Sequence, residues 1–387
     1  MKILGIHSGH NASATLMVNG SIVCAWQEER FTGIKNQQGF PLNCLKEIVK
    51  SFLKNNLNYI DLVVHATIDL DISSIFLRRY CGFDVKDHVK ENHEIWKNYF
   101  YGNKKLNSDY WLKLFKEKKF INEFSNYSPK NFTKLNYDEA NNIFNTKERL
   151  DFLREKYNFK GTQIFADHHK CHAYYACYGS EIRDINYKDI LIITADSYGD
   201  DKNWSVSEVK NNGKLNLLKS GNDNTVARIY RFTTLILGMK PLEHEYKVMG
   251  LSAYSKSKKH INDVCKVFIE MLDFKEGNFF SKKPLQDSYF DLKNRLEGFR
   301  FDNIAAGLQE WSTLITKKWI EHWLKLTNKK VVCFSGGLSM NVKSNGEIID
   351  KIKDLKNMYV PASGGDETLS IGACFFAAKE ISKIKVN

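Results

Sequence analysis

Two stretches, one at the start and one at the middle of the sequence, share one pattern, an apolar run that ends in polar residues and glycine. Residues 2–6 (KILGI) lead into HSGHNAS, and residues 189–200 read DILIITADSYGD. Short apolar runs bounded by turn residues are typical of buried strands. Asn19-Gly20 lies between two further strand-like segments and predicts a hairpin, because a type I′ turn needs positive φ at both central positions. The repeated pattern predicts a duplicated α/β fold with two lobes.

One segment of different character interrupts the predicted lobes. Residues 1–69 and 160–185 are assigned to the first lobe and residues 186–387 to the second, which leaves an α-helical insertion at 70–159. The insertion places lysines beside aromatic residues at helical spacing, as in EIWKNYFYGNKK. It is either an amphipathic subdomain with solvated lysines or a nucleic-acid surface, where cations meet phosphates and rings meet bases. Duplicated α/β lobes of this kind resemble the two-lobed ATPase fold of actin and hexokinase.

Charge and cysteine usage indicate the surroundings of the protein. Lysine and arginine exceed aspartate and glutamate by 57 to 45, and the net charge of +12 should attract polyanions. A genome rich in AT would also favour a sequence so rich in lysine, asparagine and isoleucine. The eight cysteines are scattered and form no C-x-x-C pair, which predicts reduced thiols in a cytoplasmic protein. No apolar run reaches about 18 residues, so we expect no membrane partner.

The segment 167–180, DHHKCHAYYACYGS, contains a candidate metal site. His168 and His172 are four residues apart, so on a helix they lie on one face and can bind one ion. His169 stands where the H-E-x-x-H zinc peptidases have glutamate, which excludes that class. An isolated H-x-x-x-H pair also arises by chance, and a third ligand is needed. Asp366, in the loop SGGDETLSIGA, is a candidate, although it could simply cap the helix that follows.

Polar residues follow several other predicted strands. His7 and His10 end the first run, and Asp196 and Gly199 are placed at the matching turn of the second lobe. The Gly-Gly turn in FSGGLSMN leaves room for a nucleotide to approach the backbone, although such a turn alone is a weak indication. A charged run after the hairpin contains Lys35 and could equally be solvated surface.

Six motifs together resemble one family. In order they are SGHNASATLMVNGSIVCAWQEERFTGIKNQQGFP, DHHKCHAYYACYGS, TADSYGD, EYKVMGLSAY, SGGLSMNVKSN and GGDETLSIGA. They resemble the O-carbamoyltransferases of nodulation and antibiotic biosynthesis, whose transferase domain is similar to the tRNA-threonylcarbamoyl transferase. The resemblance implies transfer of a carbamoyl group from carbamoyl phosphate, through a carbamoyl-adenylate made with ATP, to a hydroxyl. No motif of the family covers residues 70–160.

The resemblance also implies roles for individual residues. A divalent ion, iron(II) by analogy, would be held by His168, His172 and Asp366 and would grip the nucleotide phosphates. His10 would act as the general base for the acceptor hydroxyl, a task that suits a side chain titrating near neutral pH. Lys35 would hold a phosphate. The predicted cofactor-binding set is Asp196, Gly199, Gly336, Gly337, Asn341 and Gly365.

The sequence departs from the family in two places. Members commonly have aspartate after the histidine matched by His10, whereas this chain has Asn11. Typical members also continue into a second domain that makes the adenylate, and this sequence ends soon after the helix that follows Asp366. We therefore expect either a separate adenylate-forming protein or a chain that both activates and transfers.

The acceptor is the least constrained prediction. The net charge and residues 94–120 favour a nucleic acid, with hydroxymethylcytosine in bacteriophage-type DNA as the leading hypothesis, reached in a single strand or after base flipping. A hydroxyl of a sugar or an antibiotic-type small molecule is the alternative. A small-molecule kinase and a non-catalytic nucleotide-binding protein of the same fold remain open.

Overall fold

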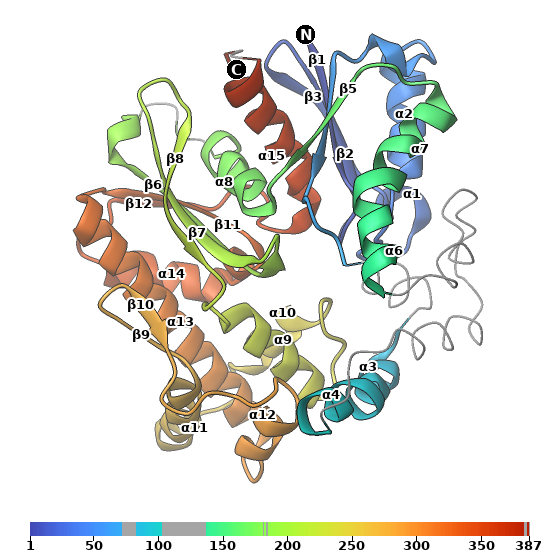
Figure 1. Ribbon diagram of the computed structural model, residues 1–387. Helices are drawn as coiled ribbons and strands as arrows, with labels where there is room; N and C mark the ends of the chain where they lie inside the picture. Colours follow the sequence, from blue (N-terminus) through green and yellow to red (C-terminus); the bar gives the residue numbers. More distant parts are fainter. Residues whose placement is uncertain (72–82, 103–136, 181, 183–184, 383–384, 387) are drawn as a thin grey trace. The chain divides into compact units, whose positions relative to one another are not determined.

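The computed structural model describes residues 1–71, 83–102, 137–180, 182, 185–382 and 385–386 (Figure 1). These residues form two compact units. Of them, 1–71, 83, 137–179 and those from 365 onward belong to unit 1, and 84–102 and 180–364 belong to unit 2. The division differs from the predicted lobes in two places. The segment from residue 365 onward is grouped with unit 1, and residues 84–102 are grouped with unit 2.

Unit 1 is built on a five-stranded mixed sheet in the order β3-β2-β1-β4-β5. Strands β1 to β3 form an antiparallel meander, whereas β4 and β5 run parallel to β1. The strands are β1 (Lys2–His7), β2 (Ser13–Val18), β3 (Ser21–Gln27), β4 (Leu62–Ala66) and β5 (Thr162–Ala166). The carboxyl ends of β1, β4 and β5 therefore meet at one edge, where ligands of α/β sheets commonly bind.

Unit 2 repeats this topology. Its large sheet has the order β12-β11-β6-β7-β8, with β6 to β8 antiparallel and β11 and β12 parallel to β6. The strands are β6 (Ile190–Gly199), β7 (Lys202–Val209), β8 (Leu215–Gly221), β11 (Val331–Ser335) and β12 (Asn357–Tyr359). A small antiparallel hairpin of β9 (Asp273–Lys275) and β10 (Asn278–Phe280) comes between β8 and β11 in chain order. The duplicated α/β class predicted from the repeated pattern is confirmed.

The two hairpins show where the repeat was predicted well and where it was not. Asn19 and Gly20 have φ of 50° and 86°, which confirms the type I′ turn of unit 1. In unit 2 the polar turn predicted from Asp196 to Gly199 is wrong, because β6 continues to Gly199 through a register shift after Ala195. The tight turn lies at residues 200–201, where both aspartates have positive φ.

Helices cover the sheet of unit 1 and fill its core. They are α1 (Glu29–Thr32), α2 (Leu42–Phe52), η1 (Leu57–Tyr59), α6 (Tyr137–Ile143), η5 (Phe144–Glu148), α7 (Arg149–Tyr157), α8 (His168–Tyr178), η8 (Asp366–Thr368), α15 (Leu369–Phe376) and η9 (Ala377–Ile381). α15 packs on β1, where a Cβ at Gly5 would lie 2.0 Å from the carbonyl oxygen of Ser370. This close approach joins the C-terminal helix to the first strand.

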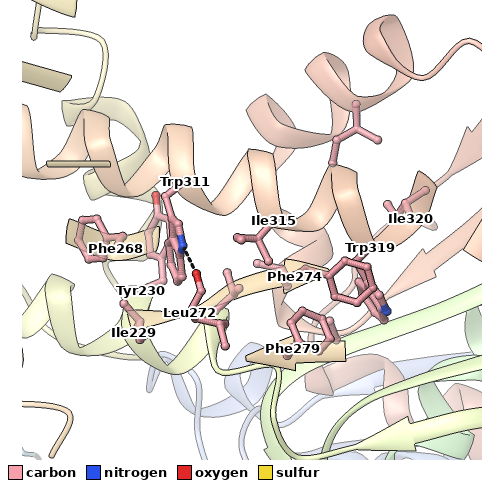
Figure 2. Close-up of a cluster of buried hydrophobic side chains, with 14 of the residues drawn as sticks. Ile229, Tyr230, Phe268, Leu272, Phe274, Phe279, Trp311, Ile315, Trp319 and Ile320 are labelled. Atoms are coloured by element: carbon pink, nitrogen blue, oxygen red, sulfur yellow. Dashed lines mark hydrogen bonds between the residues drawn. The ribbon is translucent and has the colours of Figure 1, made fainter. Parts of the chain in front are cut away.

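Unit 2 has its own aromatic core around the long helix α13 (Figure 2). Its helices are α3 (Val85–Glu91), η3 (Asn92–Trp96), α4 (Lys97–Tyr101), η6 (Tyr187–Asp189), α9 (Val226–Ile236), α10 (Glu245–Leu251), α11 (Lys258–Met271), α12 (Phe290–Arg295), α13 (Phe301–Thr327), η7 (Gly337–Met340) and α14 (Val342–Lys351). Trp311 stacks on Phe268 and donates its indole N–H to the carbonyl of Leu272 at 2.9 Å. The buried indole is thereby satisfied, as a polar atom in a core must be.

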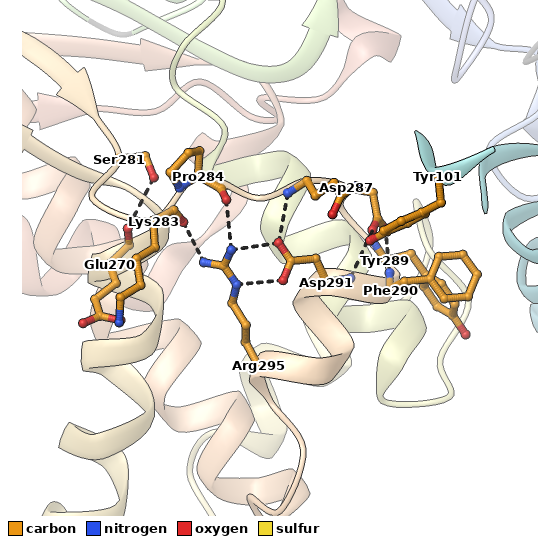
Figure 3. Close-up of polar contacts among 11 residues, drawn as sticks. Tyr101, Glu270, Ser281, Lys283, Pro284, Asp287, Tyr289, Phe290, Asp291 and Arg295 are labelled. Carbon is orange, nitrogen blue, oxygen red and sulfur yellow. Dashed lines mark hydrogen bonds and ion pairs between the residues drawn. The ribbon is translucent and has the colours of Figure 1, made fainter. Parts of the chain in front are cut away.

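Polar contacts join α4 to the rest of unit 2 (Figure 3). The hydroxyl of Tyr101 donates to Asp287, whose carboxylate also accepts the backbone N–H of Phe290 at 2.6 Å at the start of α12. Arg295 holds Asp291 through two bonds of 2.9 and 2.7 Å. The bond from Tyr101 to Asp287 attaches residues 84–102 to unit 2, although the sequence placed them in an insertion of the first lobe.

The described parts of the predicted insertion are helical. They are α3, η3 and α4 on one side and α6, η5 and α7 on the other, with 72–82 and 103–136 outside the described residues. Most of the aromatic and basic stretch at 94–120 therefore lies outside them. Among the residues that the structure describes, no helix is both long enough and apolar enough to cross a membrane.

Candidate metal centre

Two histidines on one helix and an aspartate near the C-terminus lie together in unit 1. α8 begins directly after β5, and the side chain of Asp167 caps it by accepting the backbone N–H of Lys170 at 2.8 Å. His168 and His172 follow one turn apart, with ring centroids separated by 4.8 Å. Their Nε2 atoms lie 3.8 and 3.3 Å from Oδ1 of Asp366. The structure therefore brings together the three residues that the sequence analysis named as candidate ligands.

The donor set of this cluster suits a divalent metal ion. Both histidines are buried, and the ligand atoms that they and Asp366 offer lie within 4.8 Å of one another. Two imidazoles and one carboxylate form the set used by non-haem iron(II) and also occur in zinc enzymes. The residues present therefore fit the ion predicted from the sequence.

Close packing of two helices sets the distance between the ligands. Asp366 begins η8, which leads directly into α15, and α15 packs along α8. A Cβ at Gly372 would lie 2.0 Å from the carbonyl oxygen of Cys171, so the two backbones approach as only glycine allows. Cys171 itself is buried in this contact, in keeping with a packing role.

Thr67 and Arg149 lie next to the cluster, and no sequence pattern pointed to either. Oγ1 of Thr67 lies 3.1 Å from Nδ1 of His168. The guanidinium of Arg149, fully buried, donates from Nη2 to the carbonyls of Ala66 and Thr67 at 3.0 and 2.7 Å, and from Nη1 to that of Ile68 at 3.0 Å. In the sequence this arginine sits among other charged residues and is indistinguishable from a solvated one.

Two further histidines at this edge of the sheet are neutral at physiological pH. Burial, followed by the nearby His168, lowers the pKa of His7 to about 3. Burial, followed by the positive charge of Arg149, lowers the pKa of His65 to about 3. Neutral imidazoles avoid the cost of placing additional positive charge beside a buried guanidinium and a cation site.

His10 is half-buried beyond the end of β1. Its Nδ1 lies 3.2 Å from Nε2 of Gln38, and its carbonyl oxygen lies 2.9 Å from Nε2 of His7. The imidazole is thus oriented by a neighbouring side chain, as a general base requires. Lys35, the other predicted catalytic residue, is exposed after α1.

Asn11, where the family commonly has aspartate, has a clear structural role. Its Nδ2 donates to Oε2 of Glu367 at 3.0 Å, and its backbone is left-handed with a φ of 58°. Asparagine tolerates this conformation and supplies the donor, whereas an aspartate would face Glu367 as a like charge. The departure from the family pattern is therefore matched by a partner in η8, next to Asp366.

In unit 2 the predicted nucleotide-binding residues gather around the end of β11. The backbone N–H of Gly337 donates to Oδ2 of Asp196 at 2.9 Å. Gly336 has a φ of 95°, and a Cβ there would lie 2.3 Å from the carbonyl oxygen of Ala195. Glycine at this position is therefore required by the fold itself, and Asp196 stabilises the turn.

The other predicted cofactor-binding residues are dispersed. Asn341 caps α14 by accepting the N–H of Ser344 at 3.0 Å, and its amide also pairs with Gln309. Gly199 is the last residue of β6. Gly365 precedes η8 in unit 1, directly before Asp366. A role of these residues toward a nucleotide stays a prediction.

Comparison with known families supplies the identity of the chain. The model of the carbamoyltransferase N-terminus matches residues 2–375. The chain belongs to the carbamoyltransferase N-terminus family. The resemblance inferred from the six motifs is thereby confirmed, and the paired histidines of α8 and Asp366 all lie within the matched residues.

This family member is also similar in sequence to individual curated proteins. An uncharacterized protein of Methanocaldococcus jannaschii is 26% identical over 390 residues, covering 100% of this chain and 59% of that protein. The nodulation protein NolNO of Sinorhizobium fredii is 24% identical over 223 residues, covering 57% of this chain and 32% of that protein. The chain thus spans less than two thirds of the length of the curated relatives it matches.

Solved structures with distant similarity include component A of the (R)-2-hydroxyglutaryl-CoA dehydratase of Acidaminococcus fermentans. It is 13% identical, with a TM-score of 0.47 and coverage of 99% of each chain.

Proposed function

We propose that this carbamoyltransferase-family chain transfers a carbamoyl group to a hydroxyl. The observation that carries the proposal is the cluster of His168, His172 and Asp366, which lies within the matched family region and has the donor set of a catalytic divalent ion. The proposed donor is carbamoyl phosphate, converted with ATP to a carbamoyl-adenylate. The adenylate is made either by this chain or by a separate adenylate-forming protein.

The transfer step is an acyl substitution. The acceptor oxygen forms a bond to the carbamoyl carbon, the bond from that carbon to the phosphate oxygen breaks, and AMP leaves with the electron pair. The proton of the acceptor hydroxyl passes to His10. An iron(II) or similar ion at His168, His172 and Asp366 would neutralise the phosphate charge and fix the donor. Lys35 would add a second positive charge for a phosphate.

The contact between Gln38 and His10 bears on this step. When the amide nitrogen of Gln38 donates to Nδ1, the proton of the neutral ring stands on Nε2. In the other tautomer the ring proton stands on Nδ1, the amide oxygen of Gln38 would accept it, and Nε2 has a lone pair. His10 would accept the hydroxyl proton through Nε2 in this second tautomer.

The proposed nucleotide contacts remain those inferred from the family. Asp196 and the Gly336-Gly337 turn are held together by the hydrogen bond from the N–H of Gly337 to Asp196, so any contact of theirs with a nucleotide rests on the family resemblance. Gly199, Asn341 and Gly365 complete the set.

For the acceptor we propose hydroxymethylcytosine in DNA. A net charge of +12 favours a polyanion. In unit 2, Tyr99, Phe100 and Tyr101 are 42, 40 and 45% exposed on the short helix that also contains Lys97, and exposed rings beside a cation suit unpaired bases. A sugar or antibiotic-type hydroxyl is the competing acceptor.

One assay separates these possibilities. The full chain is incubated with iron(II) and labelled carbamoyl phosphate plus ATP, or with preformed carbamoyl-adenylate. The acceptors are DNA containing hydroxymethylcytosine, the same DNA with cytosine, free nucleotides and aminoglycosides. Products are analysed by mass spectrometry.

We expect one carbamoyl group on the hydroxymethylated DNA only. Label on the small molecules alone would overturn the DNA acceptor but not carbamoyl transfer. Phosphate on the product would indicate a kinase. No product even with preformed adenylate would overturn carbamoyl transfer.

A further inference from the structure

Thr67 has a backbone conformation that its residue type disfavours. It follows the last residue of β4 and has a φ of 69°. Of the twelve non-glycine residues with positive φ in the described part of the chain, it is the one with a β-branched side chain. Such a residue in the left-handed region is a genuine outlier, and strain of this kind is concentrated at functional sites.

The chain contains its own control for this position. β4 pairs with β1 in unit 1 as β11 pairs with β6 in unit 2. The last residue of β4 lies opposite His7, and the last residue of β11 lies opposite Thr194. The residue after β11 is Gly336, also with positive φ. Unit 2 thus has the residue that the backbone prefers, whereas unit 1 has threonine at the equivalent place.

The strained backbone is held by side chains from another element. Arg149, at the start of α7, donates to three consecutive carbonyls, those of residues 66, 67 and 68. Asn145, in the preceding turn, bonds both the N–H and the carbonyl of Leu70 at 3.0 Å. The segment after β4 is therefore held by hydrogen bonds at residues 66–68 and again at Leu70.

The conformation that results aims the Thr67 hydroxyl at Nδ1 of His168. The other ring nitrogen, Nε2, faces Asp366. A histidine binds a metal through a nitrogen that has no proton, so ligation through Nε2 requires the ring proton on Nδ1, where the Thr67 oxygen accepts it.

We propose that Thr67 is a positioning residue for His168, fixed in its conformation by Arg149, and that it sets the tautomer and orientation in which His168 can bind a metal ion. The inference rests on the metal site of the proposed function and adds a residue that does not touch the ion.

The first test reads the tautomer without any metal. The full chain is labelled with ¹⁵N-histidine, and long-range ¹H–¹⁵N spectra are recorded at slightly alkaline pH, with His168 assigned by the loss of its signals in His168→Gln. We expect the Nδ1–H tautomer in wild type and in Thr67→Ser, and a mixture of tautomers in Thr67→Val. The same single tautomer in Thr67→Val would overturn the proposal.

The second test measures Co²⁺ binding by its visible absorption. Loss of such outer hydrogen bonds typically weakens metal affinity about 10- to 100-fold, and we expect this for Thr67→Val, with Thr67→Ser close to wild type. Thr67→Gly removes the hydroxyl but suits the left-handed backbone, so it keeps the test valid where valine impairs folding. Unchanged affinity and spectrum in a folded Thr67→Gly would overturn the proposal.

The two proposals fail differently. Co²⁺ binding that His172→Ala leaves unchanged would overturn the metal site, and the tautomer experiment would still decide the role of Thr67.

Discussion

The two units share one sheet topology but differ at one equivalent residue, which follows β4 in unit 1 and β11 in unit 2. Thr67 and Gly336 both have a positive φ, of 69° and 95°. At Gly336 the reason is steric, because a Cβ would lie 2.3 Å from the carbonyl oxygen of Ala195. At Thr67 the conformation costs about 1–2 kcal/mol and is accompanied by a hydrogen bond to His168. The difference teaches that a repeated backbone can serve packing in one unit and a site in the other.

The same edge of the sheet also differs in titratable groups. In unit 1 it contains His7 and His65, both buried, beside Arg149. At the equivalent positions of unit 2 stand Thr194 and Phe334. At these two positions the buried histidines are confined to unit 1, and the titratable group near this edge in unit 2 is Asp196, which accepts the backbone N–H of Gly337.

The largest expected effect comes from removing a ligand of the candidate metal centre. His172→Ala should abolish specific metal binding and lower carbamoyl transfer by on the order of a thousandfold, because the charge stabilisation supplied by a bound ion is worth several kcal/mol. Transfer rates and bound metal per chain are the measurements. Lys170→Ala, on the exposed side of the same helix, is the matched control. Equal losses in both variants would contradict the assignment.

Exchanging residues between the equivalent turns tests the comparison directly. Gly336→Thr should lower the free energy of unfolding by about 3 to 5 kcal/mol, since it adds both backbone strain and a steric overlap. Thr67→Gly should change that free energy by no more than about 1 kcal/mol, since its backbone already suits glycine. Urea denaturation of both variants measures this difference. Similar losses at both sites would show that Thr67 is retained for packing.

Acid should destabilise unit 1 through its buried histidines. The pKa of His65 is about 3 in the folded state against 6.5 for an ordinary histidine, so the unfolded chain binds a proton that the folded chain does not. The stabilisation is complete above pH 6.5 and is lost as pH falls from 6.5 toward 3, by up to about 1.4 kcal/mol per pH unit. His65→Phe places at this position the residue type of Phe334. It should reduce by one the number of protons taken up on unfolding, so the denaturation midpoint should depend less steeply on pH. An unchanged slope would refute this assignment.

The smallest effect is expected at the contact between the loop after β1 and η8. Asn11→Asp should cost about 1–2 kcal/mol, because it replaces a hydrogen bond to Glu367 by two like charges. Adding Glu367→Gln should recover most of the loss, because the new amide at position 367 can donate a hydrogen bond to the new carboxylate at position 11. The denaturation midpoints of the two single variants and the double variant form the cycle. Additive losses would mean that the contact does not matter.

Much of unit 1 could be predicted because its information is local. The hairpin at Asn19-Gly20 follows from residues that accept positive φ, and the pairing of His168 with His172 follows from helical spacing. The turn predicted at Asp196 was wrong because polar residues can also occupy an irregular strand.

By itself the sequence determined the duplicated α/β class, the helix that presents the two histidines and the family, since periodicity, turn residues and ordered motifs are properties of neighbouring positions. Only the tertiary structure revealed Thr67 beside His168, Arg149 at the carbonyl of Thr67, and Glu367 opposite Asn11. Their roles depend on hydrogen bonds between residues far apart in the chain. A buried arginine and a solvated one look alike in a sequence, because burial is a property of the folded chain.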